Sequence, residues 1–360
     1  MIPCLANLFP GIFRDTGMQG RDNSFDLIRH FAALLVLFSH HFALSGLKEP
    51  TVPLWDTYGF VAVAIFFAIS GYFMPQSHAN SDGFSGFMAK RCKRIFPGLI
   101  ACSFVMVYVI GAIFTTTSVH HYFLSGSQLK TVVMYSTFLG RGIPTVFSDF
   151  IYKDAINGSL WTLPVEFLCY LIIGSALSLR HSWKTIMCLL WVACIATATL
   201  NQKWTDFAYY GIPMSYVALF GVAFATGALL AMTRDSWMKA RLPMVAVSLL
   251  MLLLMRGRPE IQVLGTASIA VLTVVIGVSF KDRILKGRFD ISYGIYIYAF
   301  PIQQIVINRV TGNFWLSMFI SAVLTMIAGC ISYRYVERPF LQSKRKTAQA
   351  TASAMSSAVA

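Results

Sequence analysis

The chain of 360 residues is 56% hydrophobic and only 12% charged, and its mean hydropathy is +0.64. A soluble globular domain carries about 25% charged residues, so this composition excludes the usual soluble classes and predicts an integral membrane protein. The seven cysteines include no CxxC pair and no Cys/His ligand spacing, which disfavours structural zinc and a disulfide scaffold.

Ten segments come close to the roughly 20 apolar residues that a bilayer-crossing helix needs. An eleventh apolar stretch, 131–140, has about half this length and lies between Lys130 and Arg141, so we expect an interfacial or re-entrant piece there. The ten segments predict an all-α polytopic membrane helix bundle with spans at 25–46, 58–75, 95–117, 160–180, 185–200, 212–232, 242–255, 261–280, 289–309 and 313–336.

The net charge of +14 would suggest a nucleic-acid partner in a soluble chain, but cytoplasmic loops of membrane proteins are also enriched in Lys and Arg. With ten spans and a cytoplasmic N-terminus, 20 of the 29 Lys and Arg residues fall on the cytoplasmic side and eight outside. Counting 131–140 as a span would reverse the later segments and erase this asymmetry. We therefore expect both termini in the cytoplasm and no nucleic-acid partner.

Residues 24–340 are expected to form one membrane domain. Residues 1–23 lack the basic start and the small-residue cleavage site of a secretory signal, so they predict a short interfacial or flexible segment. The last 20 residues, 341–360, are basic and then small and polar, a composition that predicts a disordered cytoplasmic tail.

Ionisable residues inside apolar spans are costly and usually mark a pathway or site. Arg29 and His40 lie eleven positions apart in the first span, which places them within about 20° on one helix face and about 16 Å apart along the axis. Arg29 could instead reach the cytoplasmic interface and pair with Asp26. His40 lies too deep for this. His41 points about 100° away from that face, and we expect it to bond a neighbouring helix.

Three further polar residues are expected at the depth of His40. Glu166 lies six residues into a span that starts outside, and Gln303 and Gln304 lie in the outer half of the ninth span. Together they suggest a polar site, although interhelical hydrogen bonding would explain any one of them.

A basic cluster, Lys90, Arg91, Lys93 and Arg94, immediately precedes the third span. Such a cluster is explained by membrane topology or lipid headgroups, or by phosphate binding, because guanidinium binds phosphate bidentately. With His40 about 16 Å away along the channel, the cluster predicts a site for an elongated ligand with an anionic head and a reactive end, such as an acyl-coenzyme A.

Six short motifs in this chain match known ones, and the chain resembles the acyltransferase-3 family of membrane acyltransferases over residues 24–340. Many members carry a histidine where this chain has Ala299, so a role for that imidazole does not carry over. No esterase-like C-terminal domain of the kind some members have is expected. The resemblance rests on SFDLIRHFAALLVLFSHH with Arg29 and His40, FFAISGYFM, KRCKRIFPG with Arg91 and Arg94, SLWTLPVEF with Trp161 and Glu166, SYGIYIYAFPI and SYRYVERPF.

The resemblance implies an O-acyltransferase of the bacterial inner membrane. It would move an acyl group, most simply acetyl, from cytoplasmic acyl-CoA to a hydroxyl of a surface polysaccharide or lipid-linked saccharide, with no metal or permanently bound cofactor. The implied roles are donor phosphates on Arg91 and Arg94, Arg29 guiding the donor's arm, His40 acting on the thioester, Glu166 orienting His40, Trp161, Gln303 and Gln304 contacting the sugar, and Ser70 and Gly71 letting the arm pass.

Several alternatives remain open on the sequence. Gly71 and Ser70 could instead be a small-residue contact between helices. A transporter or flippase for a glycan would show the same polar lining, although we find no inverted repeat of the kind many transporters have. A catalytically silent member is a third possibility, and the intact motif residues argue against it. The oligomeric state is not indicated.

Overall fold

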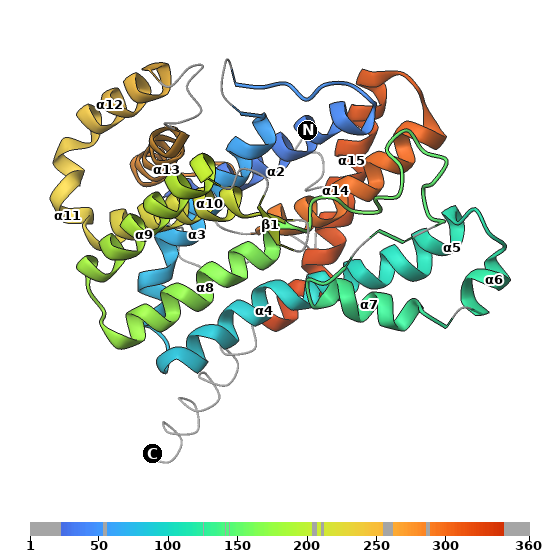
Figure 1. Cartoon of the computed structure of the whole chain (residues 1–360), viewed down its shortest axis with the longest axis horizontal. Helices are drawn as coiled ribbons and strands as arrows, with labels where there is room; N and C mark the ends of the chain where they lie inside the picture. The colour runs from blue at the N-terminus through green and yellow to red at the C-terminus, as the bar shows by residue number, and fades with distance from the viewer. Residues whose placement is uncertain are drawn as a thin grey trace, which may run out of the picture.

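The computed structural model describes residues 23–52, 56–124, 126–140, 142–143, 145–203, 207–209, 212–254, 262–285 and 289–341. Most of them are helical (Figure 1). The elements are α2 (Phe25–Leu44), α3 (Tyr58–Ala79), α4 (Gly83–Phe104), η1 (Val105–Ile110), α5 (Gly111–Phe114), α6 (Val119–Leu124), α7 (Gln128–Ser136), α8 (Thr162–Leu179), α9 (Trp183–Lys203), β1 (Ala208–Tyr209), β2 (Ile212–Pro213), α10 (Met214–Met232), α11 (Arg234–Trp237), η2 (Met238–Ala240), α12 (Arg241–Leu254), α13 (Gln262–Ser279), α14 (Ser292–Ile305), η4 (Val306–Val310), α15 (Phe314–Ser332) and η5 (Tyr333–Glu337).

Within the described ranges, nine helical segments are long and apolar enough to cross a membrane. The predicted ninth span, 289–309, is α14, which has only 14 residues and continues as the π-helix η4. In the region of the 131–140 stretch, α7 has nine residues, too few to cross a bilayer. The predicted all-α polytopic bundle is confirmed. Residues 1–22 of the predicted N-terminal segment 1–23 and residues 342–360 of the predicted tail 341–360 lie outside the described residues.

The apolar runs become helices because a helix satisfies every backbone hydrogen bond internally, as the bilayer requires. Local signals fix where two of them begin. The Thr57 hydroxyl accepts a hydrogen bond from the Phe60 amide at the start of α3, and the Asn313 side chain does the same for the Leu316 amide at the start of α15.

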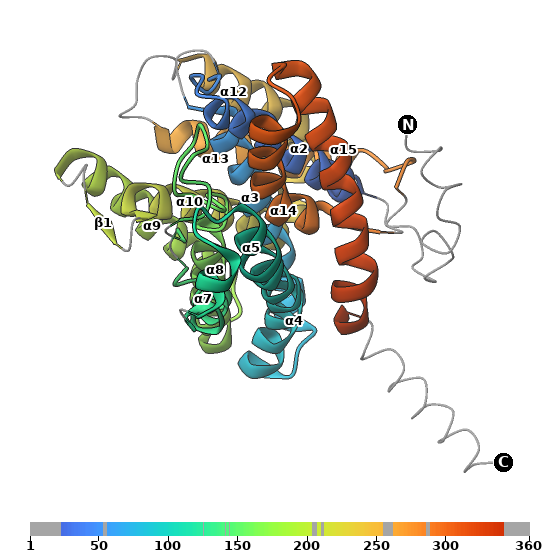
Figure 2. The same ribbon diagram turned by 90° about the vertical axis from the view of Figure 1, so that its right-hand side faces the viewer.

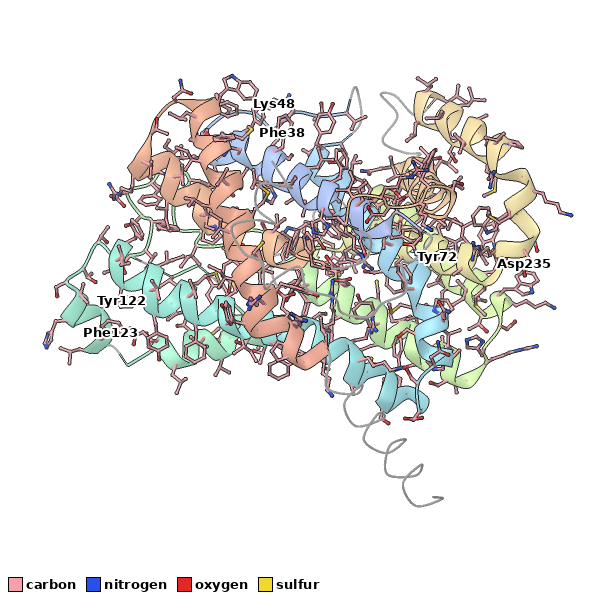
Figure 3. The ribbon with its side chains drawn as sticks, turned by 180° about the vertical axis from the view of Figure 1, so that it is seen from behind. Phe38, Lys48, Tyr72, Tyr122, Phe123 and Asp235 are labelled. Carbon is pink, nitrogen blue, oxygen red and sulfur yellow. The ribbon has the colours of Figure 1, made fainter. Side chains whose placement is uncertain are left out.

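Helix α3 lies at the centre of the bundle. In its apolar window 78% of the residues are buried, against 11% for α9 and for the segment that contains α12. It packs against α2, α8, α10 and α13, while α15 runs along one side (Figure 2). The α11–α12 segment, marked by Asp235, and the α5–α6 segment, marked by Tyr122, lie at opposite ends of the long axis (Figure 3). The centre of α3 is therefore the place where a buried site can form.

Two glycines allow α3 and α10 to touch backbone to backbone. A Cβ added at Gly71 would lie 1.9 Å from the Phe224 carbonyl oxygen, and one at Gly227 would lie 2.1 Å from the Ala68 carbonyl oxygen. The surroundings of Gly71 therefore support the alternative interpretation, in which this glycine allows two helices to pack closely.

Candidate active site

A polar pocket, here called the arginine pocket, lies between α2, α3, α4, α8 and α14. Side chains from separate parts of the sequence meet there because α2, α4 and α8 pack against α3, and α14 packs against α2 and α4. It contains all three arginines that the sequence singled out. Its polar lining is Arg29, Ser70, Arg91, Arg94, Thr162, Glu166, Tyr170, Ser292, Tyr293 and Tyr296.

Two of the three arginines are paired with carboxylates. Arg94 donates to Asp290 over 2.5 Å, and Arg29 lies 3.5 Å from both Asp290 and Asp26. The ion pair with Asp26 is the one expected if Arg29 only reaches the cytoplasmic interface, but Arg29 also lines the pocket. Asp290 thus neutralises part of the positive charge and holds both guanidiniums in place.

Arg91 has different surroundings. Its guanidinium donates to the Ser77 hydroxyl over 3.1 Å and lies over the rings of Tyr170 and Phe87, 5.7 and 5.8 Å from their centroids. Its buried Nε atom has no hydrogen-bond partner, and among the described residues Arg91 forms no ion pair. A guanidinium with a buried nitrogen and no carboxylate partner is stabilised by a counter-charge, so Arg91 is the arginine best prepared to bind an anion.

Glu166 lies in the arginine pocket and is not brought to His40. Its Oε1 accepts hydrogen bonds from the Ser70 hydroxyl over 2.6 Å and from the Tyr170 hydroxyl over 2.5 Å. Glu166 does not lie beside His40 as expected, because α8 begins at Thr162 and Glu166 lies one helical turn further along α8 than Thr162. Ser70 reaches the pocket as predicted, through this bond.

His40 lines a second pocket, here called the histidine pocket. Its Nδ1 atom lies 3.3 Å from the Ser159 hydroxyl, and its ring meets the edge of Phe300 at 5.8 Å between centroids. Arg29 and His40 are on one helix, α2, so this helix joins the two pockets. The polar and aromatic lining is His40, Glu49, Asp56, Thr57, Phe60, Trp161, Thr162, Tyr216, Phe220 and Tyr296.

Two carboxylates of this pocket, Glu49 and Asp56, were not predicted from the sequence. Both lie in the connection between α2 and α3. Glu49 accepts a hydrogen bond from Ser39 over 2.6 Å, and Asp56 accepts one from Gln262 over 2.8 Å. Burial raises the pKa of the Asp56 carboxyl. Their signal in the sequence is weak: two of only 15 acidic residues fall in the sixteen positions that follow His40.

Trp161 lines the histidine pocket as predicted, but Gln303 and Gln304 do not. Gln303 donates to the Leu37 carbonyl over 2.8 Å, and Gln304 donates to the carbonyls of Tyr152 and Ala155 over 2.8 and 3.1 Å. Both amides therefore tie neighbouring segments together. Trp161 packs near Tyr216 and Phe220 and forms an aromatic wall.

His41 bonds a neighbouring helix, as expected. It is fully buried, and its Nε2 lies 2.9 Å from the Ser317 hydroxyl on α15. The two adjacent histidines therefore have separate surroundings. His40 faces a pocket with two carboxylates, and an imidazole there can accept a proton from a hydroxyl that the carboxylates orient.

Comparisons with known proteins give matches that cover nearly the whole chain. A family model described as an acyltransferase domain matches residues 22–334. An O-acetyl transferase of Shigella phage Sf6 is 39% identical over 328 residues, which cover 89% of this chain and 96% of that protein. Nodulation protein 10 of Rhizobium leguminosarum bv. viciae is 27% identical over 351 residues, 90% of this chain and 94% of that protein. No solved structure matches the chain.

Proposed function

The chain belongs to the acyltransferase-3 family and is a multi-pass membrane acyltransferase, and on this premise we propose that it transfers an acetyl group from acetyl-CoA to a saccharide hydroxyl. The donor binds in the arginine pocket and the acceptor in the histidine pocket. One helix, α2, presents Arg29 to the first pocket and His40 to the second, and this arrangement supports the proposal.

The arginine pocket suits the anionic part of coenzyme A. Arg91 lacks a carboxylate partner among the described residues, so a phosphate there gains a charge-assisted bidentate contact. Arg29 and Arg94, already held by Asp290, add positive charge next to it. With the basic residues on the cytoplasmic side, the donor enters from the cytoplasm, where acyl-CoA is available.

The transfer itself needs a base near the acceptor hydroxyl. Neutral His40 accepts the hydroxyl proton while the oxygen attacks the thioester carbon. A C–O ester bond forms, the C–S bond breaks, and the imidazolium returns the proton to the coenzyme A thiolate. A route in which His40 carries the acyl group for a short time has the same overall balance.

The histidine pocket suits an acceptor with several hydroxyl groups. Carboxylate oxygens of Glu49 and Asp56 can accept hydrogen bonds from hydroxyls, and the aromatic wall formed by Trp161 and Tyr216 offers an apolar face for a sugar ring. The similarity to the phage O-acetyl transferase supports an acetyl donor. We propose that the acceptor is a bacterial surface glycan or its lipid-linked precursor, and that the enzyme works in the inner membrane.

The purified protein in liposomes should be given acetyl-CoA labelled in the acetyl group, with a panel of methyl glycosides and lipid-linked oligosaccharides. The proposal predicts a labelled ester on at least one saccharide and release of coenzyme A in equal amount. Movement of a saccharide across the liposome membrane without a labelled ester would favour the transporter alternative. Labelling with a free acetyl phosphate donor but not with acetyl-CoA would contradict the donor assignment.

A further inference from the structure

The arginine pocket and the histidine pocket meet at three residues. Val63 of α3, Thr162 of α8 and Tyr296 of α14 line both pockets, one from each of three helices. Tyr296 is buried, with 7% of its surface exposed. A residue that two pockets share forms the wall between them.

Hydrogen bonds hold this wall in place. Tyr296 donates its single hydroxyl proton to the Ser159 carbonyl over 2.8 Å, so Thr162, whose Oγ1 lies 2.5 Å from the Tyr296 oxygen, donates to Tyr296. The ring of Tyr296 also packs edge-on against Phe66, with 5.8 Å between centroids. The tyrosine is therefore fixed at its hydroxyl and along its ring.

The wall is connected to His40. Ser159 accepts the Tyr296 proton with its carbonyl, and its hydroxyl lies 3.3 Å from Nδ1 of His40. A rotation of Tyr296 would free the Ser159 carbonyl and disturb the residue that contacts the imidazole. The position of Tyr296 and the orientation of His40 are thus linked through one residue.

We propose that the Tyr296–Thr162 hydrogen bond is a partition that separates the bound thioester from the histidine pocket until an acceptor is present. This inference rests on the proposed function, because it assigns the donor to one pocket and the acceptor to the other. While this hydrogen bond is formed, the partition is closed and keeps water that enters from the histidine pocket away from the thioester. Opened by the turning of Tyr296, it joins the two pockets so that the acyl group reaches His40. Tyr296 is in this sense a positioning residue.

The test is acetyl-CoA hydrolysis without acceptor, measured as thiol release, in wild type, Tyr296→Phe and Thr162→Val. Thr162→Val removes the Thr162–Tyr296 hydrogen bond, whereas Tyr296→Phe removes this bond and the one to the Ser159 carbonyl, and both keep the shape of the side chain. Loss of one hydrogen bond shifts an opening equilibrium by about 2- to 12-fold, so hydrolysis should rise by about this factor in Thr162→Val and by at least as much in Tyr296→Phe, while the ratio of transfer to hydrolysis falls. Tyr298→Phe is the matched control, because Tyr298 lies two positions along α14 and lines neither pocket.

A second readout is independent of turnover. Ser70→Cys, in a chain without its native cysteines, places a thiol in the arginine pocket, and a membrane-impermeant thiol reagent is applied from the histidine-pocket side. Modification should be several-fold faster when Tyr296→Phe or Thr162→Val is added. Equal modification rates with and without these changes would overturn the partition. If wild type transfers acetyl groups but Tyr296→Phe and Thr162→Val hydrolyse acetyl-CoA at the wild-type rate, the partition is also overturned and the proposed function stays intact. Absence of acetyl transfer in wild type would count against the proposed function itself.

Discussion

Arg94 donates to Asp290 over 2.5 Å, whereas Arg91, three positions earlier on the same helix, forms no ion pair among the described residues. The two arginines of one Arg-x-x-Arg motif therefore have different surroundings, from which we expect different effects of replacing them. Arg91 is available to a ligand anion. Arg94 supports the pocket by neutralising Asp290.

Replacement of Arg91 by alanine should raise the KM for acetyl-CoA and leave the KM for the acceptor nearly unchanged. A hydrogen bond to a charged group contributes about 1.5–3 kcal/mol, so the expected increase is roughly 10- to 150-fold. Steady-state kinetics with each substrate varied in turn measures it. Lys93→Ala, on the same turn but outside the arginine pocket, is the control, and an unchanged donor KM in Arg91→Ala would return this residue to a purely topological role.

Replacement of Arg94 by alanine should instead destabilise the protein, because it leaves the Asp290 carboxylate without its nearest cation. Removing one partner of a buried pair costs about 3–5 kcal/mol, and the cost here should be smaller because 27% of the Arg94 side chain and 15% of the Asp290 side chain are exposed. Thermal unfolding of the detergent-solubilised protein should show a clear loss, and adding Asp290→Asn should recover more than half of it. A double variant no more stable than Arg94→Ala would mean that the pair does not stabilise the fold.

Replacement of Gly71 by alanine should lower the yield of folded protein, because the new Cβ would lie 1.9 Å from the Phe224 carbonyl oxygen and force α3 away from α10. Overpacking costs about 1–3 kcal/mol, and backbone contact leaves little room to relax. Gly221→Ala is the matched control, since its Cβ would meet Ala193 at an ordinary 3.5 Å. Equal size-exclusion profiles and melting temperatures for the two variants would refute this packing role.

The pH dependence of acceptor binding should report Asp56. Burial raises the pKa of its carboxyl, so on acidification Asp56 becomes protonated at a higher pH than an exposed aspartate and loses acceptor capacity for a saccharide hydroxyl. The acceptor KM of wild type should therefore rise as the pH falls through this raised pKa, and Asp56→Asn should lack this rise. Asp149→Asn, at an exposed residue paired with Arg309, should behave as wild type; identical profiles for Asp56→Asn and wild type would exclude Asp56 from acceptor binding.

Helical periodicity predicted the parts of the site that lie on one helix. Arg29 and His40 share a face of α2, and the structure places them in two adjoining pockets. His41, about 100° away, bonds another helix as expected. Composition and the length of the apolar runs likewise predicted the all-α membrane bundle, because a helix satisfies its backbone hydrogen bonds within one apolar segment of about 20 residues.

Relationships between distant segments could not be predicted in this way. Asp290 lies 196 positions from Arg94, and no local pattern pairs them. Glu49 and Asp56 lie in a connection, where no helical period fixes the direction of a side chain. Counting positions along straight spans predicts Glu166 at the depth of His40, but depth does not say which neighbour a side chain meets, and Glu166 bonds Ser70.

Acetyl transfer by His40→Ala should be measured in liposomes, with labelled acetyl-CoA and an acceptor that wild type uses. General acid–base catalysis contributes about 10²- to 10⁴-fold, so transfer should fall by at least about 100-fold while thermal stability and donor binding stay near wild type. His120→Ala, at an exposed residue of α6, should transfer normally. A His40→Ala protein that is folded, binds acetyl-CoA and acetylates the acceptor at nearly the wild-type rate would contradict the assignment of His40 as the catalytic base.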